Sequence, residues 1–263
     1  MVKLIAGMAI CILWFTIVHT VKLFRMYLIL LEKRIRFGRF VFAYCRTTLA
    51  NLIIPFKLGE IYRMIVFSRL AGGAGMGIGS VIVDRFFDTL ALVLILIPLH
   101  ILYPSGTSAV SVFLAVFVVA IIFVYITFPS AYRYLNRYII IHRGAGFSMS
   151  VLKWLEVLNA GYEHIRQLVR GRYALLVIMS FAAWVLEGGL LYVFALFIGE
   201  TCDLGVFSEY ITSIMSAGRS ALQFKYIAFS ASVMAVFTAV TGVIWGVICK
   251  RSLRHDGRDW VVR

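Results

Sequence analysis

The chain alternates long, continuous apolar runs with short clusters of basic residues. Runs of this kind are long enough to cross about 30 Å of hydrocarbon as helices. They lack the period-two alternation of barrel strands, so the pattern favours helices. It predicts an all-α, polytopic membrane helix bundle with about five full spans. The expected spans contain Leu4–Val18, Phe86–Tyr103, Ala109–Phe128, Tyr173–Ile198 and Tyr226–Cys249.

The first run resembles the start of a signal peptide, because Lys3 precedes Leu4–Val18. No small-residue cleavage site follows it, and His19 and Lys22 come directly after. We therefore expect a retained first span.

Basic intervals alternate with neutral or acidic ones along the chain. Residues 22–46, 129–172 and 250–263 are rich in Lys and Arg, whereas "YPSGTS" (103–108) is neutral and "GETCDLG" (199–205) is acidic. Basic loops stay in the cytoplasm. The charge pattern therefore predicts two cytoplasmic loops, a cytoplasmic C-terminal tail and an external N-terminus.

This alternation requires two further segments to enter and leave the membrane on one side. Phe40–Ser80 is expected to be a hairpin of two helices or a re-entrant pair, with break points at Pro55 and in "AGGAGMGIGS" (71–80). Val206–Leu222 is too short and polar for a full span, and is expected to be a second re-entrant or surface segment. Irregular backbone at membrane depth is tolerated where it is buried in protein or lines a cavity, and two such segments indicate a cavity.

Composition supports a single membrane domain over residues 1–263. The chain is 62% hydrophobic with a mean hydropathy of +0.94, and it contains no interval suited to a soluble catalytic domain. The net charge of +14 fits cytoplasmic loops near anionic headgroups better than nucleic acid. The four cysteines are scattered, so we expect no metal site, disulfide framework or cofactor.

Residues 152–172 have the pattern of an amphipathic helix. Leu152, Leu155, Leu158 and Tyr162 share one face at helical spacing. The pattern fits an interfacial helix and a solvated linker helix equally well.

The first candidate site lies after Pro55, where Lys57, Glu60 and Arg63 interrupt an apolar segment. Glu60 and Arg63 are expected to pair at i,i+3 on a helix. Charges inside a membrane usually face a cavity or a partner. The three charges sum to +1 and would suit a lipid phosphate, or they could be an ion-paired helix end at the interface.

A second candidate site is "VIVDRFFD", in which Asp84 and Asp88 share a face at i,i+4 beside Arg85. The carboxylates could perform acid–base chemistry, hold a cation, counter the upstream basic cluster, or form an ordinary charged helix entrance. Arg85 and Asp88 are also i,i+3 neighbours.

The third candidate is Glu187, about halfway along an apolar span and close to Trp184. A mid-span carboxylate needs a partner unless it is protonated. Gly188 and Gly189 beside it permit close helix approach. Arg219 is a candidate partner.

The stretches "RTTLANLIIPFKLGEIYRMIVF" and "GSVIVDRFFDTLALVLIL" together resemble the lysylphosphatidylglycerol synthase transmembrane family, also called the flippase-like domain family. "WVLEGGLLYVFALFIGE" is similar to a later helix of that family, so the resemblance covers most of residues 46–199. Where the family commonly has a Pro-Gly-Gly-rich motif followed by Glu, this chain has "SIMSAGRSALQFKYIAF". The matching residues are Asn51, Pro55, Lys57, Gly59, Glu60, Arg63, Asp84, Arg85 and Asp88.

The resemblance implies a lipid-handling domain, which in some members is a flippase for aminoacylated phospholipids or polyprenyl-linked sugars. We expect Lys57, Arg63 and Arg85 to bind a lipid phosphate. Five residues would form or orient a polar cavity, and two would supply a break or hinge. The cavity residues are Asn51, Glu60, Asp84, Asp88 and Glu187, and the hinge residues are Pro55 and Gly59.

Two other functions fit the sequence. One is a membrane-embedded lipid-linked glycosyl or phosphoryl transferase that uses Asp84 and Asp88, and the other is a non-transporting accessory subunit. No soluble aminoacyltransferase domain is legible, so lipid aminoacylation is not expected. The expected location is a prokaryotic inner membrane, with membrane lipids as partners and either a homo-oligomer or envelope-biogenesis proteins as further partners.

Overall fold

A computed structural model gives the fold of residues 2–54, 58–102, 109–142, 147–201, 207, 210 and 221–259. This part of the chain contains eight α-helices, one short 3-10 helix and no strand, which confirms the all-α prediction. The elements are α1 (Val2–Ile29), η1 (Leu31–Lys33), α2 (Phe37–Ile53), α3 (Leu58–Ala71), α4 (Ala74–Leu102), α5 (Ala109–His142), α6 (Phe147–Val169), α7 (Tyr173–Ile198) and α9 (Ala221–Asp259).

Four of the expected spans lie in helices that are long and apolar enough to cross a membrane. Within the described residues these are Ile5–Ile29, Ser111–Ile141, Tyr173–Ile198 and Leu222–Ile248. The remaining expected span falls in α4, which begins twelve residues earlier than its apolar run and carries charged residues in its first half.

The first helix is longer than the sequence pattern suggested. Residues 22–46 were expected to be a cytoplasmic loop, but α1 continues through Ile29 and α2 begins at Phe37. Arg25 and Met26 are almost completely buried. The short connection between the helices contains η1, one residue before it (Leu30) and three residues after it.

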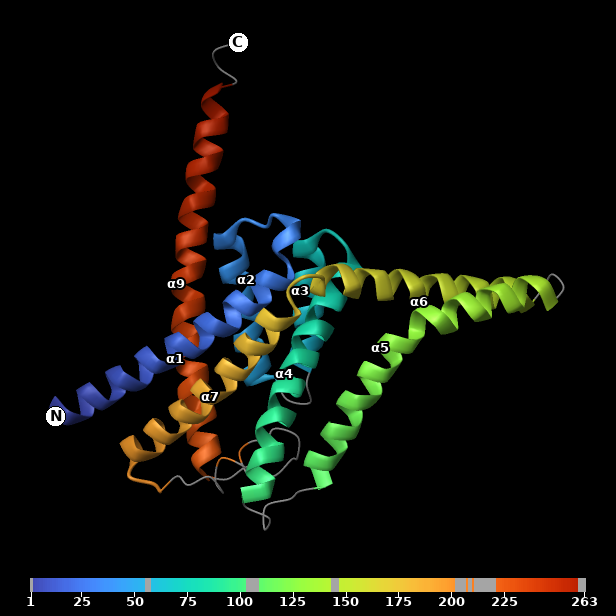
Figure 1. Ribbon diagram of the computed structural model, residues 1–263. Coiled ribbons are helices and arrows are strands. Elements are labelled where there is room, and N and C mark those ends of the chain that lie inside the picture. The colour runs from blue at the N-terminus through green and yellow to red at the C-terminus, as the bar shows by residue number, and fades with distance from the viewer. Residues whose placement is uncertain are drawn as a thin grey trace.

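The segment after this connection is a hairpin of two short helices, α2 and α3, which pack against each other. In Figure 1 the connection before α2 and the turn after α3 lie at the same, upper end of the bundle. The alternative of a two-helix hairpin is therefore correct. Its second boundary differs, because Ser80 lies inside α4 and only Gly72 and Gly73 form the turn.

Glycines allow α3 to lie very close to both of its neighbours. A Cβ on Gly59 would lie 2.6 Å from the Asn51 Cα in α2. A Cβ on Gly77 of α4 would lie 2.1 Å from the Ser68 backbone nitrogen in α3. Gly59, which the sequence proposes as a break or hinge, lies in the first turn of α3 and packs closely against α2 there.

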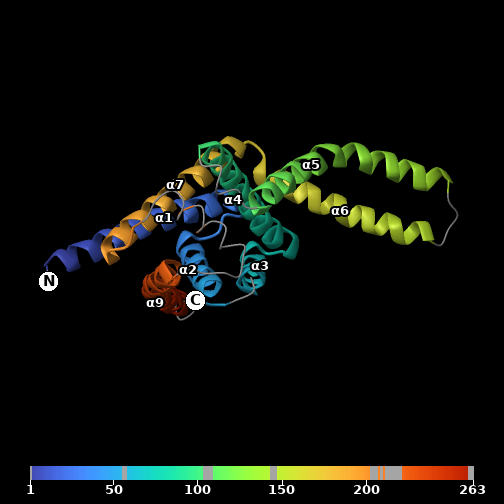
Figure 2. The same cartoon turned by 90° about the horizontal axis from the view of Figure 1, so that it is seen from below.

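Residues 129–172, also expected to be a loop, are mostly helical. The second half of α5 and most of α6 form an antiparallel arm that extends away from the bundle in both views (Figures 1 and 2). Tyr162 of α6 packs on Phe128 and Tyr125 of α5, with ring centroids 5.0 Å and 5.2 Å apart. The predicted amphipathic helix is therefore present as α6.

The bundle itself is built on α1 and α7, which lie side by side (Figures 1 and 2). The Trp14 indole of α1 donates a hydrogen bond to the Leu186 carbonyl oxygen of α7 (2.9 Å). Gly189 leaves room for that indole, because a Cβ there would lie 2.8 Å from it. Helix α9 packs against α2, and Cys11 and Cys45 are buried and free. Of the second broken segment, Phe207, Tyr210 and the start of α9 are described, and Arg219 lies outside the described residues.

Candidate functional site: a buried charge network

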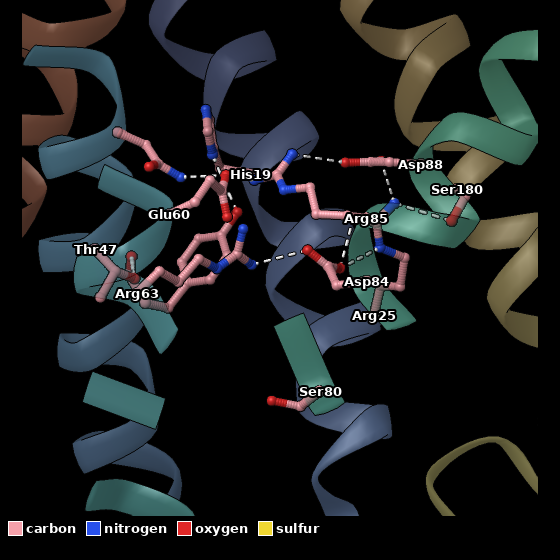
Figure 3. A network of polar contacts seen from close by, with 12 residues as sticks. His19, Arg25, Thr47, Glu60, Arg63, Ser80, Asp84, Arg85, Asp88 and Ser180 are labelled. Carbon is pink, nitrogen blue, oxygen red and sulfur yellow. Dashed lines mark hydrogen bonds and ion pairs between the residues drawn. The ribbon is translucent and has the colours of Figure 1, made fainter. Parts of the chain in front are cut away.

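Six charged side chains from α1, α3 and α4 form one continuous chain of ion pairs, here called the charge network (Figure 3). Acidic and basic groups alternate along it, and three of each sign make it neutral. In order, its members are Glu60, Arg85, Asp88, Arg25, Asp84 and Arg63.

Arg25 of α1 is the centre of the network. Its Nη2 lies 2.7 Å from Asp84 Oδ1, and its Nη1 lies 2.5 Å from Asp88 Oδ1. The same Nη1 donates a hydrogen bond to the Ser180 hydroxyl of α7 (2.9 Å). The Arg25 side chain is only 2% exposed and that of Asp84 only 1%. Because Asp84 and Asp88 are one helical turn apart, a single guanidinium fork can engage both.

Arg63 of α3 reaches the other oxygen of the same carboxylate. Its Nη2 lies 2.9 Å from Asp84 Oδ2, without the alignment that a hydrogen bond requires, since that oxygen accepts none. Asp84 is therefore placed between two guanidinium groups from different helices. The expected Glu60–Arg63 pair along α3 is not the one formed, because both residues turn toward α4.

The other end of the network is more open. Arg85 Nη2 lies 2.5 Å from Glu60 Oε1, and Arg85 Nη1 lies 3.2 Å from Asp88 Oδ2. Asn51 of α2 donates its amide to Glu60 Oε1 (2.7 Å). The Arg85 side chain is 44% exposed, so this end can be reached from outside the bundle. Arg85 and Asp88, which the sequence places at i,i+3, form an ion pair.

Three buried polar atoms in the network lack a hydrogen-bond partner: Glu60 Oε2, Arg63 Nε and Asp84 Oδ2. Buried polar groups are normally satisfied by protein or ordered water. The network therefore has both donor and acceptor capacity left over in its interior.

A second polar cluster surrounds Glu187 of α7. Lys22 of α1 donates to its Oε2 (2.6 Å), while the hydroxyl groups of Tyr226 and Tyr210 donate to its Oε1 (2.7 and 3.3 Å). The Lys22 ammonium also lies 5.8 Å from the centre of the Trp184 ring. A carboxylate in the middle of an apolar span was expected to need a partner. Among the described residues, the cationic partner of Glu187 is Lys22.

The structure brings together six of the ten residues proposed from the sequence, namely Asn51, Glu60, Arg63, Asp84, Arg85 and Asp88. Glu187 lies in the separate cluster with Lys22. Pro55 and Lys57 lie outside the described residues. Gly59 contacts Asn51.

Sequence reasoning missed Arg25 and Lys22, which it used only as loop charges. Both are placed inside α1, one turn apart, and each contacts a carboxylate on another helix. The run "MYLILL" after Arg25 could have shown this, because apolar residues on both sides place the two charges within a span.

No group of three His, Cys, Asp or Glu side chains in the described part of the chain is arranged to hold a metal ion. The two aspartates that might have done so both engage Arg25.

Long apolar helices around a buried, charge-balanced network define a polytopic integral membrane protein with a polar interior site. The family described as the lysylphosphatidylglycerol synthase TM region matches residues 2–222, and the chain belongs to that family.

A UPF0104 membrane protein of Methanocaldococcus jannaschii is 25% identical over 182 residues, which cover 64% of this chain and 70% of the relative. The family and this relative point to a membrane protein of lipid biogenesis. No solved structure matches the chain.

Proposed function

We propose that this protein binds an anionic lipid or lipid-linked saccharide and moves it between the two leaflets, with the charge network as the site that takes up the lipid phosphate. The observation that carries the proposal is the alternating network itself. Six charges inside a bundle of apolar helices are costly unless they serve a polar ligand or a path, because ionisable groups at membrane depth are expensive.

The exposed end of the charge network supports Arg85 as the point where a lipid phosphate enters. Its guanidinium is held by Glu60 and Asp88 but remains partly exposed. A lipid phosphate would replace the Glu60 carboxylate there, exchanging one charge-assisted contact for another. The unused Arg63 Nε and the Asn51 amide are donors that would then face the ligand.

The charges also match a monoanionic ligand. The network is neutral, and Lys57 one residue before α3 adds a fourth basic group in the sequence. With Lys57 included, the region carries +1 and would become neutral on binding a phosphodiester. Lys57, Arg63 and Arg85 thus remain the proposed phosphate-binding residues, while Glu60, Asp84 and Asp88 keep the empty site neutral.

The geometry favours a counter-ion role for the aspartates over an acid–base role. Asp84 and Asp88 both hold Arg25, which favours transport or lipid binding over a transferase that would need a free carboxylate pair. The proposed setting is a prokaryotic inner membrane with the basic end of the bundle in the cytoplasm.

Transbilayer movement in proteoliposomes tests the proposal. Replacing Arg85 by Gln should slow translocation of a fluorescent anionic phospholipid at least about tenfold, because a charge-assisted contact to the phosphate is lost. The matched control is Arg166→Gln, which removes an exposed arginine that also pairs with a carboxylate at i,i+3. Equal rates in wild type, Arg85→Gln and Arg166→Gln would reject the role of the network.

A further inference from the structure

The connection between α1 and α2 forms the rim of a pocket of about 320 Å³ that the charge network does not use. It lies at the basic end of the bundle, where α2 begins. Four basic side chains, Ile35 of the connection and two apolar side chains from α3 and α9 line it: Lys33, Arg34, Ile35, Arg36, Arg39, Leu70 and Trp245.

The four cations are not neutralised by acidic neighbours among the described residues. None of them lies within ion-pair distance of a described carboxylate. The adjacent acidic residue, Glu32, pairs with Arg172 (3.1 Å). Four like charges around one open cavity repel one another, so an anion in the cavity would relieve that repulsion.

The backbone adds to this positive potential. Helix α2 is 17 residues long and begins at Phe37, and its N-cap residue Arg36 makes no side-chain capping hydrogen bond. The first intrahelical bond of this end is donated by the Phe40 N–H to the Arg36 carbonyl oxygen. The preceding N–H groups are free of intrahelical partners, and the helix dipole places partial positive charge beside them.

One residue of the connection between α1 and α2 has an unusual backbone conformation. Arg34 has φ 48° and ψ 39°, in the left-handed region that non-glycine residues rarely adopt. Among the described residues it is the sole non-glycine with positive φ. Such conformations persist where the surroundings fix them, and they cluster at ligand-binding loops.

Two of the apolar lining residues, Leu70 and Trp245, come from other helices. Trp245 of α9 approaches the first turn of α2, where a Cβ on Gly38 would lie 3.6 Å from the indole ring. Leu70 contributes from the end of α3. A general preference for basic residues at cytoplasmic helix ends does not require them to converge on a cavity with an indole wall.

We propose that this pocket binds a phosphate group, carried either by the headgroup of an anionic lipid or by a soluble phosphate. Arginine forks suit phosphate oxygens, and the free N–H groups of α2 supply further donors. The site is separate from the charge network, since Phe37 and Asn51 lie roughly 21 Å apart along α2 at 1.5 Å per residue. It does not depend on translocation.

Ligand binding by the purified full chain in uncharged detergent tests this site. The probes are dioctanoyl phosphatidic acid, inorganic phosphate and pyrophosphate, with dioctanoyl phosphatidylcholine as the zwitterionic reference. Arg36→Gln/Arg39→Gln should weaken phosphatidic acid binding at least about tenfold. Arg133→Gln/Arg137→Gln removes the same charge from exposed positions on α5, and should change affinity less than about twofold because surface charges far from a site are screened.

The probes identify the source of the phosphate. Binding of phosphatidic acid that phosphate and pyrophosphate do not displace assigns the site to a lipid headgroup, whereas full displacement assigns it to a soluble phosphate. No saturable binding of any probe, or equal weakening in both double variants, would overturn the proposal.

Two further measurements keep the outcome interpretable. Lys33→Gln/Arg34→Asn changes the loop outside α2, and Asn tolerates the left-handed conformation at position 34. This double variant should also weaken phosphatidic acid binding. Thermal unfolding is the control that tests whether each variant is folded. All of these variants are compared in an Arg85→Gln background, which removes the phosphate contact proposed for the charge network, so that failure of this pocket and failure of the proposed function give different results.

Discussion

At the scale of single residues, Arg25 determines whether the charge network is one unit or several pairs. It is the one member from α1, and it joins Asp84 to Asp88 while Ser180 fixes it to α7. Without it, Arg63 could hold Asp84 and Arg85 could hold Asp88 and Glu60. Three carboxylates would then share two guanidinium groups.

Arg25→Gln is therefore expected to destabilise the protein by roughly 3–5 kcal/mol, because it leaves a buried negative charge without compensation. The double variant Arg25→Gln/Asp84→Asn restores neutrality and should recover much of the loss. Unfolding in detergent, followed by circular dichroism against temperature or denaturant, measures both.

The control is Arg166→Gln, whose exposed pair with Glu163 contributes about 0.5 kcal/mol or less. If the double variant is no more stable than Arg25→Gln, charge balance is not what the network requires.

The sequence predicted five of the six members of the network, all but Arg25, but it did not predict which residues pair. Spacing along one helix noted Arg85 and Asp88 as i,i+3 neighbours, and these two residues do pair. It wrongly favoured Glu60–Arg63, because i,i+3 spacing cannot tell whether a neighbouring helix offers a closer partner. Arg25 was missed since charge counting treats every basic residue near a span end as a loop residue.

At the scale of elements, α3 is held close to α2 and α4 by glycines at both contacts. This close approach is what allows Glu60 and Arg63 to reach α4 with their side chains. The network therefore depends on backbone separations set by Gly59 and Gly77.

Gly77→Ala should separate α3 from α4, because the added methyl would lie 2.1 Å from the Ser68 backbone nitrogen, where no side-chain rotation can relieve it. We expect a lower unfolding temperature and weaker lipid translocation. Gly161→Ala, in α6 with nothing within 4 Å, is the matched control and should raise stability by up to about 1 kcal/mol through helix propensity. Equal stability of the two variants would contradict the close contact between α3 and α4.

The arm formed by α5 and α6 has an exposed apolar stripe on α6. Trp154, Val157 and Leu158 are exposed, and the same helix also carries the basic residues Lys153 and Arg166. Aromatic and basic residues are enriched where a helix lies in the headgroup region. We expect the arm to lie on the cytoplasmic lipid surface.

Trp154 reports on that position. The Trp154 fluorescence is taken as the difference between wild type and Trp154→Phe in proteoliposomes. Phospholipids brominated on the acyl chain near the headgroup should quench this fluorescence, whereas iodide dissolved in the water should not. Trp184→Phe removes a buried indole and serves as the comparison. A Trp154 component open to iodide and insensitive to bromolipid would place the arm in water.

The sequence predicted which segments form the long helices and in what order, but it predicted less well where each helix begins and ends. The apolar runs located the long helices, and charge alternation required a hairpin at α2 and α3. The α5–α6 arm was not predicted, because its helices carry as many basic residues as a cytoplasmic loop, although their apolar residues recur at helical spacing.

At the scale of the whole molecule, two polar centres share one helix. Lys22 links α1 to Glu187 on α7, and Arg25 links α1 to the aspartates of α4. The basic pocket at the start of α2 lies at the end of the bundle where α1 finishes. A lipid phosphate moving from that end to the network would thus follow α2.

The central claim is that the charge network takes up a lipid phosphate at Arg85. Native mass spectrometry of the purified protein, offered equal amounts of phosphatidylglycerol and phosphatidylcholine, tests it most directly. The Arg36→Gln/Arg39→Gln background removes the contribution of the basic pocket. In that background the protein should retain phosphatidylglycerol, an added Arg85→Gln should abolish the retention, and an added Arg166→Gln should not. Equal retention in all three, or no preference for the anionic lipid, would contradict the claim.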